Sequence, residues 1–125
     1  MSNFNYTPDQ EAWLQDLEKT RAKQTVGNLH DPEGWCCLGR ACKVLGVPSV
    51  QLLGWGGTHW SFDGHRQDLP AKAVKTLRLR DDLGAFLRPF GDFKTLTEMN
   101  DKGLSFKKIA AYIRANPKNV FIEQR

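Results

Sequence analysis

Residues 34–39 read Gly-Trp-Cys-Cys-Leu-Gly, and this stretch constrains the fold more than any other part of the chain. It opens a predicted helix over residues 35–45, since Gly46 suits the position that follows a helix. Adjacent helical residues point about 100° apart, so Cys36 is expected to face outward while its neighbour faces the core. The predicted core face comprises Cys37, Leu38, Ala41, Cys42 and Leu45.

Capping signals predict helices on both sides of this stretch. Thr7, Pro8 and Gln10 form the start of a helix that ends near Lys23. A Leu-Pro pair opens another helix over residues 69–79. In the C-terminal third, Thr and Glu of residues 95–98 form a capping box, and Ser105 caps a last helix that Asn116 and Pro117 end. The side chains expected to be buried on that helix are Phe106, Ile109, Ala110 and Ile113.

The middle of the chain has a different pattern. Residues 49–68 interleave aromatic and β-branched residues with glycines, which predicts one or two short strands and a hairpin around Gly56-Gly57. Residues 81–92 are broken by glycine and proline, and we expect a loop there with a short helical piece at most. Residues 120–122 could add an edge strand or pack on the core.

These elements predict an α+β fold with four to five helices around one core and a small β hairpin or short sheet in the middle. The 125 residues are 40% hydrophobic, with four Trp and seven Phe, which suffices for one core and a single domain over residues 1–125. We expect residues 49–68 to be a variable aromatic-rich insert and residues 105–125 to form a basic C-terminal helix and tail.

Composition also narrows the location of the protein. No apolar run approaches the ~20 residues of a membrane span, and residues 1–10 lack the basic flank and apolar core of a signal peptide. The three cysteines are odd in number and two are adjacent, which disfavours a disulfide framework. We therefore expect a soluble cytosolic protein with reduced thiols and no contact with a membrane.

The charge is unevenly distributed along the chain. The net charge is +4, yet residues 1–34 hold six acidic and three basic residues, whereas residues 102–125 hold six basic residues and one acidic residue. Such an asymmetry can attract the phosphates of a nucleic acid or a nucleotide. The alternative is an ordinary solvated helix face and tail.

Several motifs occur together in a fixed order. They begin with a helix bearing Trp13 and Leu17, continue with Gln-x-x-Gly-x-Leu over residues 24–29 and the Trp-Cys-Cys-Leu-Gly stretch, and reach a Leu-Pro helix start at residues 69–70. The closing motif matches Leu96, Met99, Asn100, Asp101, Gly103, Ser105, Phe106, Ile109 and Ala110. With these motifs the chain resembles a family of small uncharacterised phage and prophage proteins.

The resemblance spans residues 13–113 and implies a phage origin and a rough fold, but no established chemistry. The chain departs from the pattern at Lys108, where the family often places an acidic residue three after its Ser or Thr cap. The insert over residues 49–68 also looks particular to this chain.

Two kinds of reactive site can be weighed from the cysteines and histidines. A structural zinc site usually needs two cysteine pairs, each spaced by two to four residues, whereas adjacent cysteines beside His30 point apart. Cysteine is often buried as a small apolar residue, so we expect core packing and no metal or cofactor. His30, His59 and His65 could each serve a nucleophilic cysteine as a base, but no local signature supports a pairing. We therefore expect a protein that is not an enzyme.

Residues 96–113 resemble the front of a helix-turn-helix. In DNA readers a recognition helix must follow to enter the major groove, and only twelve residues remain after Ile113. Lys107, Lys108 and Arg114 could still contact phosphates from the last helix. The structural alternative is a plain helical hairpin.

The aromatic segment over residues 55–66 is the most suggestive feature without an obvious structural role. Its rings, beside Gly, His and Arg, could stack on a base while Arg66 binds a phosphate. They could equally form a protein-binding surface, because Trp and Arg are enriched in such surfaces. Alternatively, Trp60 and Phe62 of a hairpin simply fill the core.

We therefore expect a phage-encoded accessory protein that acts in the host cytoplasm by stoichiometric binding, in counter-defence or host takeover. Its partner would be a host defence protein or an anionic nucleotide signal, and a homo-oligomer is possible. The alternative is a nucleic-acid-binding regulator that uses the basic C-terminal helix. The candidate binding residues are Gln24, Trp55, His59, Trp60, His65, Arg66, Arg78, Arg80 and Arg88.

Overall fold

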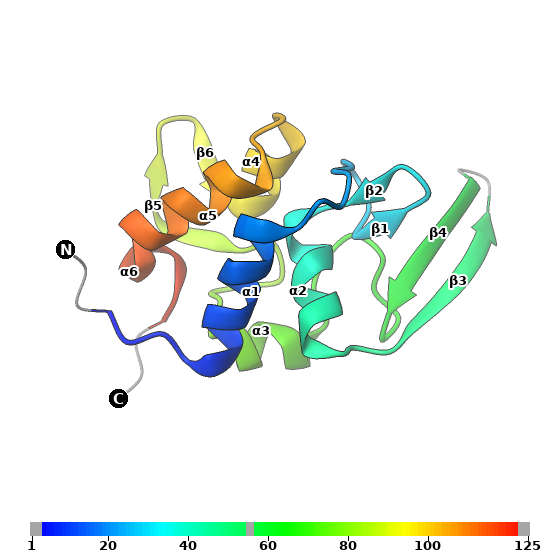
Figure 1. Cartoon of the computed structure of the whole chain (residues 1–125), viewed down its shortest axis with the longest axis horizontal. Coiled ribbons are helices and arrows are strands. Elements are labelled where there is room, and N and C mark those ends of the chain that lie inside the picture. The colour runs from blue at the N-terminus through cyan, green and yellow to red at the C-terminus, as the bar shows by residue number, and fades with distance from the viewer. Residues whose placement is uncertain (1–3, 55–56, 123–125) are drawn as a thin grey trace.

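The structure is a computed structural model that describes residues 4–54 and 57–122. Within these residues, six helices and three antiparallel two-stranded sheets confirm the predicted α+β class (Figure 1). The helices number one more than expected because a four-residue helix follows the last predicted one. The single hairpin expected in the middle is accompanied by two others.

The elements alternate along the chain. The helices are α1 (Pro8–Lys19), α2 (Cys37–Leu45), α3 (Ala71–Leu77), α4 (Leu96–Asp101), α5 (Phe106–Ala115) and α6 (Pro117–Val120). The strands pair as β1 (His30–Asp31) with β2 (Gly34–Trp35), β3 (Ser49–Gly54) with β4 (Gly57–Phe62), and β5 (Ala85–Phe90) with β6 (Phe93–Thr95).

The three predicted N-caps are confirmed, whereas the helix predicted from residue 35 begins two residues later, because Gly34–Trp35 form β2. Thr7 and Gln10 close a capping box at α1, Thr95 and Glu98 close another at α4, and the Ser105 side chain caps α5. The first helix ends earlier than expected, because Thr20 is extended and residues 23–25 instead hydrogen-bond with β2.

One cluster of buried side chains holds the helices together. Helices α1 and α2 lie side by side, and α5 packs across α1 (Figure 1). Trp13 of α1 is fully buried, and its indole Nε1 donates a hydrogen bond to the Cys37 carbonyl at 3.0 Å. The core face predicted for α5 is buried throughout.

The cysteines are core residues, but one expectation about them is wrong. Cys36 does not face outward, because α2 begins at Cys37 and Cys36 is its N-cap, with a buried thiol that accepts a hydrogen bond from the Gly39 N–H at 3.2 Å. Burial raises the pKa of Cys36 to about 11 and that of Cys42 to about 12. Burial also raises the pKa of Cys37 well above its ordinary value. All three thiols therefore stay protonated at neutral pH.

The Asn100 side chain joins three separate segments inside the core. Only 1% of this residue is exposed. Its Oδ1 accepts hydrogen bonds from the Cys37 N–H at 3.1 Å and from Gln24 Nε2 at 2.8 Å, and its Nδ2 donates to the Thr25 carbonyl at 2.8 Å. The amide thus connects α4 to the start of α2 and to the segment after α1.

The expectation of a loop over residues 81–92 is wrong, because these residues include the whole of β5. The strand pairs with β6, and Phe86 and Phe90 pack against Tyr112 of α5. Of the two alternatives for residues 120–122, packing on the core is confirmed, since Phe121 is fully buried and forms a bridge with Leu79.

None of the helices in the described part of the chain combines the length and the apolar character that a bilayer crossing requires.

Gly39 tests how tightly α2 is packed. A Cβ built there lies 1.9 Å from the Leu29 carbonyl oxygen, so Gly39→Ala must push apart α2 and the segment before β1. We expect the free energy of unfolding to fall by about 3 kcal/mol in urea denaturation. Gly46→Ala is the matched control, since a Cβ there meets nothing within 4 Å and its positive φ costs only about 1 kcal/mol. Equal losses would contradict this account of the close approach.

Candidate functional site

The predicted hairpin is confirmed, and its register separates the candidate residues onto two faces. Gln51 pairs with Trp60 and Leu52 pairs with His59. Because side chains alternate along a strand, Trp60 and Phe62 lie on one face of β4 while His59 lies on the other. The expected platform that combines Trp60 with His59 therefore does not form.

Trp60 attaches the hairpin to the rest of the molecule. The His30 ring lies between Trp35, at 3.6 Å between centroids and 10° between planes, and Trp60, at 4.2 Å and 27°. Arg40 extends the stack, 5.0 Å above the Trp35 ring, and also donates two hydrogen bonds to Asp16 of α1. The stack therefore fixes the hairpin against β1, β2 and α1.

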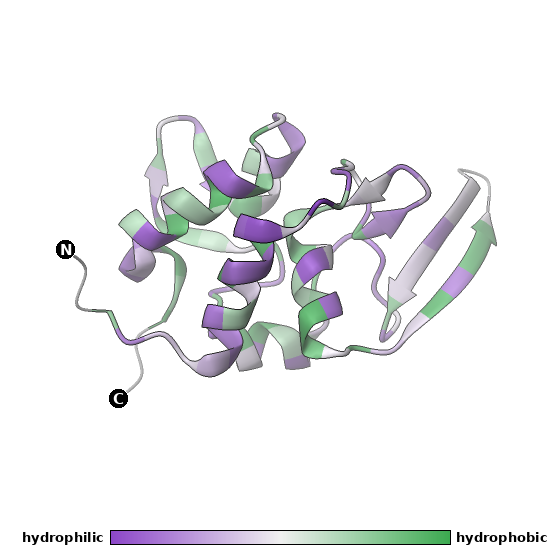
Figure 2. Ribbon diagram, viewed as in Figure 1, coloured by the Kyte–Doolittle hydropathy of each residue, from purple (hydrophilic) through white to green (hydrophobic). Residues whose placement is uncertain are grey.

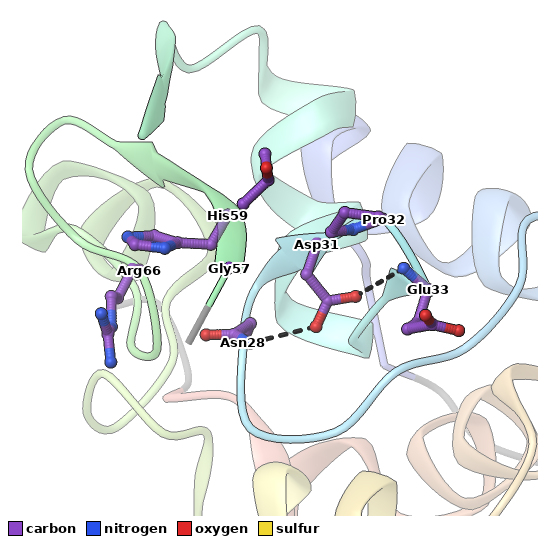
Figure 3. A pocket seen from close by; sticks show the side chains of 8 residues that line it. Asn28, Asp31, Pro32, Glu33, Gly57, His59 and Arg66 are labelled. Carbon is purple, nitrogen blue, oxygen red and sulfur yellow. Dashed lines mark hydrogen bonds between the residues drawn. The ribbon is translucent and has the colours of Figure 1, made fainter. Parts of the chain in front are cut away.

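A polar pocket of about 260 Å³ lies between the hairpin and the loop that joins β1 to β2 (Figure 3). In Figure 3 the His59 and Arg66 side chains lie on one side of β4, and Asn28 lies between them and Asp31. The lining residues are Asn28, Asp31, Pro32, Glu33, Gly57, Thr58, His59 and Arg66.

Asp31 shapes the wall of this pocket that faces the hairpin. Its carboxylate accepts hydrogen bonds from Thr25 Oγ1 at 2.9 Å, Asn28 Nδ2 at 3.0 Å, and the backbone N–H groups of Glu33 and Gly34 at 2.9 and 3.2 Å. Burial raises the pKa of the Asp31 carboxyl, but these hydrogen bonds together outweigh burial and hold the pKa below its ordinary value. The Asp31 carboxylate is thus occupied by hydrogen bonds to residues 25–34.

The two basic side chains that line the pocket, His59 and Arg66, have no side-chain partner among the described residues. Among the described residues, neither His59 nor the guanidinium of Arg66 has a hydrogen-bond or ion-pair partner. The backbone of Arg66 is held, since its carbonyl accepts a hydrogen bond from the Leu29 N–H at 2.7 Å. Within the described residues, the pocket therefore presents a guanidinium and an imidazole that have no side-chain partner, and the backbone that carries Arg66 is held in place.

The other candidate arginines lie elsewhere. Arg80 donates hydrogen bonds to the carbonyls of Lys118 and Phe121, at 2.8 and 3.3 Å, and so binds the end of the chain to the core. Arg78 follows α3, and its carbonyl accepts from the Ile122 N–H. Arg88 lies on β5, at the opposite end of the molecule from the hairpin (Figure 1).

Two further candidates have structural partners, and one cannot be placed. Gln24 Nε2 donates to Asn100 and to the Leu104 carbonyl at 2.7 Å. His65 Nδ1 lies 3.1 Å from an Asp68 carboxylate oxygen. Trp55 lies outside the residues that the structure describes.

The alternative nucleic-acid site is only partly assembled. Lys107 and Lys108 are exposed on α5. Arg114 of the same helix instead binds Glu11 and Glu18 of α1, each with two hydrogen bonds between 2.7 and 3.1 Å. Hydrogen bonds from Arg114 hold the pKa of Glu11 below its ordinary value. A phosphate could use Arg114 only by displacing two carboxylates.

Sequence reasoning missed one wall of the pocket. Asn28, Asp31 and Glu33 belong to a segment whose Asp-Pro-Glu-Gly pattern predicts a turn and nothing more. The turn is present between β1 and β2, but its position opposite β4 depends on the ring stack. No signal in the local pattern reveals that contact.

Comparisons with known proteins do not assign a function, so the function is inferred from the geometry of the site. A scan against protein-family models, a search of curated proteins and a search of solved structures each found no match to the chain. Within residues 4–54 and 57–122, no group of three or more His, Cys, Asp or Glu side chains is arranged to hold a metal ion.

Asp31 gives a prediction about pH. Because folding lowers its pKa, its contribution to stability is full above the unfolded-state pKa and is lost as the pH falls through the folded value. We expect Asp31→Asn to reduce the free energy of unfolding by about 2 kcal/mol at neutral pH. The difference from wild type should shrink between about pH 5 and about pH 2 in urea titrations. Asp92→Asn, at an exposed turn residue, is the control; a gap for Asp31→Asn that stays constant with pH would refute the assignment.

Proposed function

We propose that this protein is a phage-encoded accessory protein that acts by stoichiometric binding in the host cell, in counter-defence or host takeover. We further propose that it sequesters an anionic nucleotide signal in the pocket beside the β3–β4 hairpin. The resemblance of the motifs to phage proteins supports the origin. The ligand class is inferred from Arg66 and His59, which line one pocket and whose side chains have no partner among the described residues.

The chemistry of these side chains favours a phosphate. A guanidinium offers a planar fork of N–H donors that binds a phosphate through two parallel hydrogen bonds. A histidine N–H can donate to the same anion. Arg66 and His59 come from a loop and a strand whose backbones are held, so the site requires little ordering when a ligand binds.

The remaining lining residues suit the polar parts of a nucleotide. Thr58 supplies a hydroxyl, and the exposed Glu33 carboxylate can accept hydrogen bonds from ribose hydroxyls or exocyclic amines. The volume of about 260 Å³ is just below the roughly 300 Å³ at which ordinary ligand pockets begin. This volume accommodates the phosphate and sugar end of a nucleotide.

Of the two expected targets, this pocket therefore favours the nucleotide over a host protein. The nucleic-acid alternative is weaker because Arg114 is bound by two carboxylates of α1. The protonated state of the buried thiols favours a binding protein over a cysteine-dependent enzyme.

Arg66→Gln tests the proposal directly. We expect cyclic or ADP-ribose-type nucleotides to raise the melting temperature of the wild type. The variant should bind the same nucleotide at least about tenfold more weakly by calorimetry, since it loses a charge-assisted hydrogen bond.

Arg88→Gln is the matched control, because it removes the same charge at the far end of the molecule and should bind like the wild type. No thermal shift across the panel would refute the nucleotide ligand, and equal losses in both variants would refute this pocket. In cells that express the protein, small molecules that co-purify with the wild type but not with Arg66→Gln would identify the signal.

A further inference from the structure

β3 is an exposed strand at the rim of the molecule. All six of its residues are exposed, and the apolar Val50, Leu52 and Leu53 are 59%, 42% and 85% accessible. Figure 1 shows β3 as the outermost strand of the hairpin, at one end of the longest axis, and Figure 2 shows hydrophobic residues along it. Within the described chain, β3 pairs only with β4.

The outer edges of other strands are covered. Backbone groups of Lys23 and Thr25 hydrogen-bond with Trp35 of β2. The Asn119 side chain takes the place of a strand beside β5, accepting from the Arg88 N–H at 2.8 Å and donating to its carbonyl at 2.9 Å. The Glu98 carboxylate covers two N–H groups of β6. No described group does this for β3.

The sequence of β3 also lacks the usual protection of an edge strand. Natural edge strands carry Lys, Pro, a bulge or an inward-facing charge that prevents further pairing. β3 reads Ser-Val-Gln-Leu-Leu-Gly, with no charge and no proline, and its six-residue register with β4 is unbroken. Such an edge is a template for another strand.

We propose that β3 pairs antiparallel with β3 of a second copy of this chain, which joins two hairpins into one four-stranded sheet. The strand suits itself as a partner, because an uncharged strand places no like charges opposite each other. Foreign peptides are usually selected by side-chain pockets next to the edge. Three cavities lined by described residues, of about 260, 490 and 290 Å³, have no lining residue from β3.

The twofold symmetry restricts the register. A twofold axis perpendicular to the sheet keeps the same face up in both copies, so opposed residues must differ by an even number of positions. With the axis at Gln51, the two Gln51 side chains face each other, and Val50 of each copy lies opposite Leu52 of the other. This register pairs two of the three exposed apolar residues of β3 across the interface, places Leu53 opposite Ser49 of the other copy, and lets the two Gln51 amides hydrogen-bond.

The shape and the charge of the molecule set the strength of the dimer. The hairpin projects from the helical core (Figure 1), so the two cores lie at opposite ends of the joined sheet. A six-residue strand provides less than the roughly 800 Å² per partner of a standard interface, so the dimer is weak and concentration-dependent. Each copy has a net charge of +4, and screening of this repulsion makes dimerisation stronger as salt increases.

A charge-swap experiment tests both the partner and the register. Sedimentation of the wild type over a range of concentrations should show a monomer–dimer equilibrium. Gln51→Lys and Gln51→Glu each place two like charges across the axis and should weaken the dimer about tenfold or more. An equimolar mixture of the two variants should restore it. Ala111→Lys and Ala111→Glu, at an exposed position on α5, are the matched controls and should dimerise like the wild type.

A cysteine at the axis gives an independent readout. Opposed residues of an antiparallel pair have Cα atoms about 5 Å apart, within the range of a disulfide. Gln51→Cys should form a covalent dimer on mild oxidation, while Ala111→Cys should not, and the three native thiols are buried. A wild type that stays monomeric at all concentrations overturns the proposal. A dimer that does not respond to the charges at residue 51 overturns this interface. If the wild type is a monomer that binds a different protein, and Gln51→Lys abolishes that binding, then β3 pairs with a strand of that protein and the dimer proposal is wrong.

Discussion

The buried amide of Asn100 is the interaction on which the rest of the fold depends. It is 1% exposed, and it binds the first N–H of α2, the Gln24 side chain and the Thr25 carbonyl at once. These groups come from segments more than sixty residues away in sequence. Without the amide, the buried Cys37 N–H and Thr25 carbonyl would each lose this partner inside the core. Residues 24–25 in turn hydrogen-bond with β2, so the position of the β1–β2 loop follows from this one side chain.

Several residues of the motifs described above have a structural role in this arrangement. Gln24 is a partner of Asn100, Gly39 lets α2 approach the Leu29 carbonyl, and the thiols pack in the core. These motif residues therefore form the contact between α2, α4 and the segment after α1, which we call the joint. The binding function that we propose lies on surfaces outside this joint, where the β3–β4 hairpin projects from the helices (Figure 1).

How much the sequence could predict depended on the range of the interactions involved. Capping boxes such as Thr7 with Gln10 act within one helical turn, and their positions in the structure were predicted. The hairpin of residues 49–62 has a clear aromatic and glycine pattern. β5 was missed because it is held in part by contacts distant in sequence, such as the Asn119 amide. Two lining residues of the pocket, His59 and Arg66, were candidates by residue type, whereas the wall with Asp31 is set by tertiary packing and gave no sequence signal.

The ring stack links the structural joint to both proposed binding surfaces. His30 lies between Trp35, which is held by the joint, and Trp60, which belongs to the hairpin. The same strand that packs Trp60 inward must, by its alternation, turn His59 to the opposite face. The stack therefore sets the spacing between the Arg66 side of the pocket and the 28–33 loop, while β3, one strand further out, stays free of the core. A two-stranded hairpin is only marginally stable by itself in water. The Trp60 stack stabilises the inner strand β4, and the pairing that we propose for β3 would stabilise the outer strand.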